Sequence, residues 1–178
     1  LGGRDVKPVN FNTVREARDF ADRYHGVEGV EVHGYDRYLY QFISSEFEGE
    51  VDYRMDQMNI LTIDIEVACE NGFPDVDAAA EEMLCITVRD LATKKFIVWG
   101  TREFETEHEH YICKDEREML SHFINWWAQN TPDIVTGWNC NLYDIPYICR
   151  RVSRILGEKW MKSLSPWNKV DEEEVYIQ

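Results

Sequence analysis

MNILTIDIEV, residues 58–67, has the pattern of a β-strand with one apolar and one polar face. Side chains along a strand alternate between the two faces of its sheet. The alternation places four apolar side chains on one face, those of Leu61, Ile63, Ile65 and Val67. The other face carries Thr62, Asp64 and Glu66. The strand is apolar enough to lie in the centre of a sheet, and we expect the fold to form around it.

The chain after this strand alternates between strand and helix patterns. Residues 84–89 and 95–99 predict a β-hairpin around the turn 90–94, and 110–113 predict a further strand. Asp115 begins an N-cap signature, which a helical stripe of apolar residues follows, namely Leu120, Phe123, Ile124 and Trp127.

Two more elements complete this half of the chain. Residues 133–137 predict a short buried strand, and a last helix ends at Gly157 after the apolar residues Ile145, Ile148, Val152 and Ile155. The order strand, hairpin, helix, strand, helix predicts an α/β fold, a mixed sheet flanked by helices. This is the order of elements in a ribonuclease H-like nuclease core.

The chain before residue 57 follows other patterns. A capping box at Thr13–Glu16 predicts a helix over 14–25. Residues 30–33 and 38–43 predict short strands around a Gly-Tyr-Asp turn, and the acidic stretch 46–56 has no apolar periodicity. We therefore predict two domains, 1–57 with an α+β fold and 58–178.

Composition argues for a folded protein and against nucleic-acid binding. The 178 residues carry a formal charge of −15, and 44% of them are hydrophobic. Affinity for phosphate backbones comes mainly from Lys and Arg, so an acidic chain needs bound cations to approach DNA. No apolar run is long enough to cross a membrane, and five irregularly spaced cysteines fit a reducing cytoplasm.

Asp64 and Glu66 are the first candidates for chemistry. Residues i and i+2 of a strand lie on one face about 6.6 Å apart, so both carboxylates can bind one hard cation. A solvated strand face is the simpler interpretation of one Asp-x-Glu pair. In a central strand, however, two unpaired carboxylates repel each other and lose hydration, and a divalent cation relieves both costs.

The segment TGWNCNLYD, residues 136–144, supplies a third carboxylate. A strand ends near Gly137, a short loop carries Asn139, and Asp144 stands where the last helix begins. An N-cap role alone is the structural interpretation of Asp144. The chain order favours a functional role, because an acid pair on a strand is followed about 80 residues later by N-x-x-x-Y-D.

These residues resemble a known family. Asp64-Ile65-Glu66 resembles the first exonuclease motif of the family B (alpha-like) DNA polymerases, and the segment from Asn139 to Tyr143-Asp144 resembles the second. The phrases TGWN, YDIPY and RILGEKWMKSLSP are most similar to polymerases of T-even-type tailed phages and their cyanophage relatives. The first 57 residues resemble the N-terminal domain of these polymerases, so the resemblance covers nearly the whole chain.

The resemblance implies a proofreading 3′→5′ exonuclease within a replicative DNA polymerase. It implies two Mg²⁺ or Mn²⁺ ions per site. Asp64 would bridge both ions, Glu66 would bind the ion that generates hydroxide, and Asp144 would lie at the other ion. In two-metal sites the ions lie about 3.5–4 Å apart and stabilise the attacking and leaving oxygens. Their positive charge also answers the objection from composition.

The implied substrate is the single-stranded 3′ end of DNA. Phe73, in a Gly-Phe-Pro loop, stands where the phage polymerases place a stacking wedge, although core packing is its structural alternative. Asn139 and Tyr143 belong to the second motif and are implied DNA contacts. The implied partners are primer-template DNA, the remaining polymerase domains and a sliding clamp, in the cytoplasm of an infected bacterium and without a membrane.

One motif of the family is missing. The third exonuclease motif, Tyr-x-x-x-Asp, does not follow Asp144, and neither does any polymerase motif. We therefore expect a chain truncated at Gln178 that is weakly active or inactive alone. Two alternatives remain, a stand-alone exonuclease with the same carboxylates and a non-catalytic module that binds nucleic acid or a protein partner.

Two further clusters have weaker meanings. Residues 150–169 carry a basic strip with interleaved tryptophans, which predicts either a solvated helix face or a contact with DNA or another domain. His108-Glu109-His110 lacks a third metal ligand at a fitting spacing, so we expect a solvent-exposed loop there.

Overall fold

The computed structural model describes residues 5–33, 38–50, 52, 54–70 and 72–172. The chain forms two compact units, Leu1–Tyr53 and Arg54–Gln178. The division falls within the acidic stretch, a few residues before the predicted boundary at 57. The assignment of the first unit to a polymerase N-terminal domain stays a prediction.

The described residues of the first unit form two helices, α1 (Val14–Tyr24) and α2 (Tyr38–Glu46). Thr13 caps α1, because its Oγ1 accepts the Glu16 N–H at 3.2 Å. The predicted strands are wrong: 30–33 form no strand, and 38–43 lie within α2. A short apolar run fits a helix as well as a strand. The predicted turn at 34–36 lies outside the described residues.

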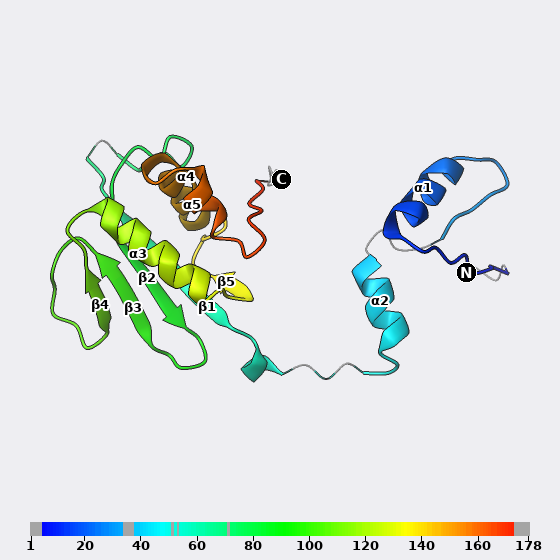
Figure 1. Cartoon of the computed structure of the whole chain (residues 1–178), viewed down its shortest axis with the longest axis horizontal. Helices are drawn as coiled ribbons and strands as arrows, with labels where there is room; N and C mark the ends of the chain where they lie inside the picture. The colour runs from blue at the N-terminus through cyan, green and yellow to red at the C-terminus, as the bar shows by residue number, and fades with distance from the viewer. Residues whose placement is uncertain (1–4, 34–37, 51, 53, 71, 173–178) are drawn as a thin grey trace. The chain divides into compact units, whose positions relative to one another are not determined.

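The second unit is built on a five-stranded sheet (Figure 1). Its strands are β1 (Ile60–Val67), β2 (Met83–Asp90), β3 (Phe96–Gly100), β4 (Glu109–Ile112) and β5 (Ile134–Thr136), in the order β4-β3-β2-β1-β5. The β1–β2 and β2–β3 pairs are antiparallel, and the β3–β4 and β1–β5 pairs are parallel. The predicted mixed sheet, with β1 inside it, is confirmed.

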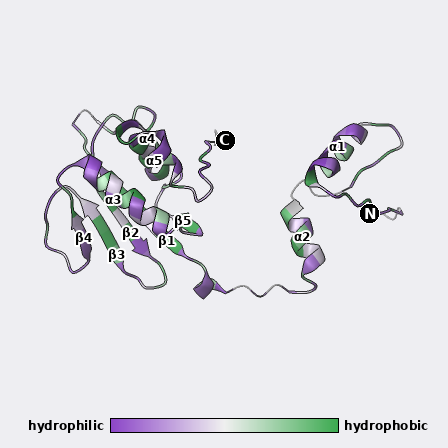
Figure 2. Cartoon of the chain, viewed as in Figure 1, coloured by the Kyte–Doolittle hydropathy of each residue, from purple (hydrophilic) through white to green (hydrophobic). Residues whose placement is uncertain are grey.

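Helices α3 (Glu116–Gln129), α4 (Asp144–Ile155) and α5 (Glu158–Lys162) accompany the sheet, and the short 3-10 helix η1 (Met55–Gln57) precedes it. Figure 2 shows hydrophilic and hydrophobic residues alternating along α3, as expected for a helix with one face on a core. That core joins Ile63 and Ile65 of β1 to Phe123 of α3 and Ile148 of α4.

Two local predictions need correction, and one helix was missed. The strand β5 is not buried, since Ile134 and Thr136 are exposed. Its short length and edge position leave it little cover. The histidine cluster is not wholly a loop, because Glu109 and His110 belong to β4 and the His110 ring packs on Phe104. α5 was not predicted. Among the described residues, no helix is long and apolar enough to span a membrane.

Candidate active site

The acid pair lies on β1 as the alternation predicts. Ile63 and Ile65 are buried, whereas Asp64 and Glu66 are exposed. The residues opposite them on β2 are Thr87 and Cys85. Neither carboxylate forms a hydrogen bond or an ion pair with any residue in the described ranges. Both acids are therefore free to bind a cation from solution.

Asp144 meets β1 between these two acids. The parallel β1–β5 pairing ends at Thr62 and Thr136, so on the β5 side of β1 no strand among the described residues pairs beyond Thr62. There the Asp144 Oδ1 atom accepts the backbone N–H of Ile65 at 3.1 Å. Residues 79 positions apart in sequence thus meet at one point, and the third acid lies beside the residue that separates Asp64 from Glu66.

The N-cap interpretation of Asp144 is wrong. Tyr143 is the N-cap residue of α4, and Asp144 is the first helical residue. Asp144 is only 4% exposed, and its carboxylate accepts a hydrogen bond from the backbone of β1. An N-cap side chain would instead accept one from the first turn of its own helix. Tertiary packing explains the difference, because the loop before α4 brings the helix start against β1.

Gly137 makes this close approach possible. A Cβ atom at this position would lie 2.4 Å from the backbone oxygen of Ile63 and 3.0 Å from the Cβ of Cys140. Asn139 then adopts the left-handed conformation, with φ of 54°, and its backbone oxygen accepts the N–H groups of Leu142 and Tyr143. This tight turn delivers Asp144 to β1.

The charge of Asp144 is poorly balanced. Burial raises the pKa of its carboxyl group, the Ile65 hydrogen bond lowers that pKa, and the charges of Asp64 and Glu66 raise it again. The charged side chains that act on this group are thus both acidic. A cation bound among the three carboxylates would relieve this repulsion.

Phe73 lies next to this site and outside the core. Its side chain is 81% exposed, and its ring centroid is 4.9 Å from that of Tyr143. Tyr143 in turn contacts Tyr147, with centroids 5.7 Å apart. Burial, and then the charge of Asp144, raise the pKa of Tyr143. The core-packing alternative for Phe73 is wrong, and an aromatic surface borders the acids. Asn139, in the turn between β5 and α4, is also exposed.

The donors suit a hard divalent cation, but they are not gathered into a ligand cluster. Carboxylate oxygens are the ligands that Mg²⁺ and Mn²⁺ prefer. Across the described ranges, however, no three acidic, histidine or cysteine side chains are placed to hold a metal ion. The chemistry of the residues therefore fits the predicted ions, and the ligand geometry remains a prediction.

Arg151 of the basic strip has a role that neither prediction gave it, and both predictions stay open for the lysines of the strip. Arg151 is 7% exposed and pairs with Glu116, while Arg154 donates to the backbone oxygen of Ala78. Arg150 pairs with Asp77 and with Glu172. These arginines bind the protein itself. Neither a solvated face nor a DNA contact describes Arg151.

The sequence patterns assign no role at this site to four residues that the structure shows to shape it or to hold the elements beside it. These residues are Gly137, Tyr147, Glu116 and Arg151. Tyr147 donates its hydroxyl hydrogen to the backbone oxygen of Glu81 at 2.7 Å. A clue existed for Gly137, since a glycine between a strand and a tight turn often marks a close backbone approach. No sequence signal pairs Glu116 with Arg151.

Residues 28–175 match the family described as DNA polymerase family B, exonuclease domain. Among curated proteins, the DNA-directed DNA polymerase of Enterobacteria phage T4 is 30% identical over 94% of this chain and 22% of its own length. The polymerase of Escherichia phage RB69 is 29% identical over 89% of the chain and 21% of its own length.

A more distant relative is the DNA polymerase catalytic subunit of Equine herpesvirus 2, which is 28% identical over 54% of this chain and 10% of its own length. The chain spans about a fifth of the length of the two phage relatives.

Proposed function

This chain belongs to the family of exonuclease domains of the family B DNA polymerases, and on that premise we propose that it carries the proofreading 3′→5′ exonuclease of a replicative phage DNA polymerase. The observation that supports this most directly is the hydrogen bond from Ile65 to Asp144, which joins the two sequence motifs at one point. The ribonuclease H-like fold class agrees with the five-stranded mixed sheet.

We infer that Asp64, Glu66 and Asp144 are the catalytic and metal-binding residues. Asp64 and Glu66 are exposed and face solvent, so they can accept cations directly. Asp144 is buried and anchored to Ile65, so it supplies fixed negative charge at the edge of β1. When bound, two divalent ions activate water and stabilise the charge that develops on the phosphate.

We propose that the DNA 3′ end lies against the aromatic surface. The exposed Phe73 ring can stack on a base, and stacking contributes about 1–3 kcal/mol per base without reading sequence. Tyr143 packs against the Phe73 ring. The exposed Asn139 can hydrogen-bond a nucleotide at the same edge. Together these residues would separate the terminal nucleotide from its neighbours and present its phosphate to the acids.

The wider setting is also a proposal. The parent protein would be a DNA-directed DNA polymerase that binds primer-template DNA, with further polymerase domains and a sliding clamp as partners, in the cytoplasm of an infected bacterium. A second function, that of a non-catalytic DNA-binding module, is favoured by one observation. The described residues do not gather three ligands around a metal position.

Metal-dependent trimming of DNA ends separates the two functions. The chain is incubated with a 5′-labelled single-stranded oligonucleotide and Mg²⁺ or Mn²⁺, and shortening from the 3′ end is followed on a gel. We expect slow trimming that Asp64→Ala abolishes and that Glu103→Gln, a change at an exposed acid outside the site, leaves unchanged.

Binding supplies a second readout for a weakly active chain. Mg²⁺ should raise the midpoint of thermal unfolding of the wild-type chain and not that of Asp64→Ala, because a ligand stabilises the state that binds it. Undiminished trimming by Asp64→Ala would refute the catalytic assignment. DNA binding without trimming or metal-dependent stabilisation would favour the non-catalytic module.

A further inference from the structure

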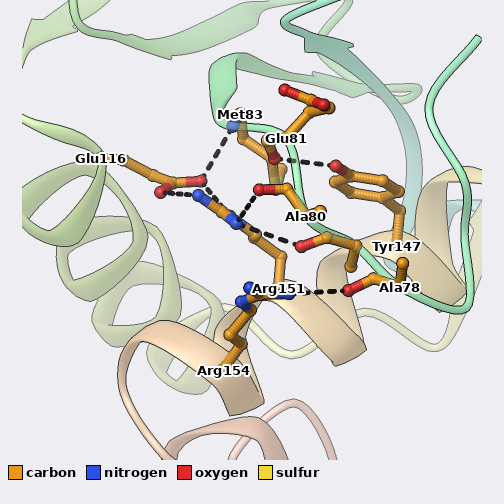
Figure 3. Close-up of polar contacts among 9 residues, drawn as sticks. Ala78, Ala80, Glu81, Met83, Glu116, Tyr147, Arg151 and Arg154 are labelled. Carbon is orange, nitrogen blue, oxygen red and sulfur yellow. Dashed lines mark hydrogen bonds and ion pairs between the residues drawn. The ribbon is translucent and has the colours of Figure 1, made fainter. Parts of the chain in front are cut away.

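Arg151 makes an unusual number of contacts for one side chain. Its Nε and Nη2 atoms donate to the two carboxylate oxygens of Glu116, each at 2.6 Å. Its Nη1 atom donates to the backbone oxygens of Ala79 at 3.1 Å and Ala80 at 2.8 Å. Figure 3 shows the guanidinium group between Glu116 and this backbone segment.

Glu116 extends the same network to β2. Its Oε1 atom also accepts the backbone N–H of Met83, the first residue of β2, at 2.8 Å. One buried ion pair therefore joins three parts of the chain: the start of α3, the middle of α4 and the segment that enters β2 (Figure 3).

The segment held in this way is the end of the loop that carries Phe73. This loop, residues 68–82, of which the structure describes 68–70 and 72–82, connects β1 to Met83. Asp75 closes a turn within it, by accepting the N–H groups of Ala78 and Ala79. Ala79 is fully buried in the left-handed conformation, with φ of 39°, which non-glycine residues rarely adopt. The two hydrogen bonds from Arg151 fix the backbone oxygens of Ala79 and Ala80 in this conformation.

Besides the exposed Arg150–Asp77 pair, four side chains of α4 and its N-cap contact this loop. They occur at spacings of four, four and three residues, which places them on one side of a helix. Tyr143 contacts Phe73, Tyr147 donates to Glu81, and Arg154 donates to Ala78 at 3.0 Å. Arg151 holds the loop most extensively. Asp144 belongs to the same helix, so one rigid element contacts both the acid site and the loop.

We propose that Arg151 is a positioning residue that fixes the 68–82 loop along α4 and thereby sets the place of Phe73 relative to Asp144. The inference rests on the proposed function, because Phe73 holds the DNA end only if the site binds DNA. The hydrogen bonds of the Arg151 guanidinium keep Phe73 and Asp144 at a constant separation. The terminal phosphate of the DNA therefore reaches the carboxylates when its base stacks on Phe73.

The chemistry explains why arginine stands here. The planar guanidinium donates two parallel hydrogen bonds to one carboxylate and still reaches two backbone oxygens, which the single ammonium group of lysine cannot do. Burial opposes the charged form of Arg151, but the hydrogen bonds and charge of Glu116 outweigh it and raise the pKa of Arg151. The guanidinium therefore stays charged.

Hydrogen exchange tests the positioning role without DNA. Arg151→Lys retains the charge and loses the paired hydrogen bonds. Arg150→Lys makes the same change at a neighbouring arginine that also contacts the loop, through one ion pair with the exposed Asp77, and a lysine can keep that single pair. In Arg151→Lys we expect amide exchange to rise about tenfold or more in residues 68–82 and to stay unchanged in β2 and β3. Arg150→Lys should match the wild type. Unchanged exchange in 68–82 of a folded Arg151→Lys chain would overturn the proposal.

A base-stacking probe tests the consequence for the DNA end. The probe is an oligonucleotide with 2-aminopurine at its 3′ terminus, bound in the presence of Ca²⁺ and well below the unfolding temperature of every variant. We expect the wild-type chain to quench the fluorescence of the bound probe, and Arg151→Lys to bind the probe with little quenching. A purely structural role would lower thermal stability and leave the quenching of the folded complex unchanged.

Tyr147→Phe gives a variant that leaves the buried ion pair untouched. It removes one hydrogen bond to the loop, at Glu81, and we expect intermediate quenching. If Arg151→Lys and Tyr147→Phe both quench the probe as strongly as the wild type does, the positioning role is wrong. If the wild type does not bind the probe, the proposed function is wrong, and hydrogen exchange alone then decides whether Arg151 fixes the loop.

Discussion

Glu116 and Asp144 occupy matching places in the fold and have different surroundings. Each is the first residue of a helix, each is buried, and each carboxylate accepts a backbone N–H, from Met83 or from Ile65. Glu116 is neutralised by a bidentate arginine. Asp144 is surrounded by the charges of two other acids.

The difference shows which buried acid supports the fold and which is held for a ligand. A buried charge is tolerated when it is paired and costs stability when it is not. Glu116 satisfies this rule within the chain. Asp144 would satisfy it only when a cation binds beside Asp64 and Glu66. The unpaired charge of Asp144 therefore supports a cation-binding role, in addition to the positions of the three acids.

Removal of the paired acid should have the largest effect on stability. Glu116→Ala leaves the Arg151 charge buried without its partner, and we expect the free energy of unfolding to fall by about 3–5 kcal/mol. Urea denaturation followed by circular dichroism measures this change. Glu158→Ala, which breaks an exposed pair with Lys162, serves as the control and should leave the midpoint nearly unchanged. Equal, small effects of the two changes would remove the distinction between the acids.

A smaller effect is expected where the backbone brings Asp144 to β1. In Gly137→Ala the new Cβ would overlap the Ile63 backbone oxygen, so the loop must move and the Asp144–Ile65 hydrogen bond must weaken. We expect a loss of about 1–3 kcal/mol in the free energy of unfolding, the usual cost of overpacking. In Gly100→Ala the nearest atom would be His110 Nε2, at 3.4 Å. If Gly100→Ala proves as destabilising as Gly137→Ala, close approach is not the cause.

The smallest effect, and the only gain, is expected at Asp144. Its pKa is raised above the ordinary value of 3.8, so the folded chain holds this proton more tightly than the unfolded chain does. The Asp144 contribution to the free energy of unfolding therefore falls as pH rises from 3.8 through the folded-state pKa. Without divalent ions, Asp144→Asn should be slightly more stable than the wild type at pH 7.

The pH dependence of that difference is the sharper measurement. The advantage of Asp144→Asn should shrink as the pH is lowered toward 3.8, where the wild-type carboxyl also becomes neutral. Added Mg²⁺ should stabilise the wild type and not the variant, which reverses the order at pH 7. A stability difference that does not change with pH would show that the charge of Asp144 is not the cause.

Much of the second unit is predictable from local patterns. The alternation of residues 60–67 identifies β1 and its exposed acids, because the period of a strand fixes which side chains share a face. The Asp115 signature identifies the start of α3, where the Asp115 Oδ1 atom accepts the Glu118 N–H at 2.8 Å. Chain order alone selected Asp144 as the third acid.

Other features depend on contacts between distant segments. Residues 38–43 form a helix although their apolar residues also fit a strand, since a strand needs a partner that the pattern does not supply. The β5 strand is exposed although most of its residues are apolar, because it lies at the edge of the sheet and its burial depends on the segments that pack on it. The roles of Arg151 and Gly137 depend on Glu116 and Ile63, which are 35 and 74 residues away in the chain.

Short-range periodicity and residue order are enough to identify the strand, its two acids, the second motif and the family. The bond between Asp144 and Ile65 and the pairing of Arg151 with Glu116 are visible only in the folded chain. The physical reason is that burial and pairing of a charge depend on which distant groups surround it, and the chain acquires those neighbours only when it folds.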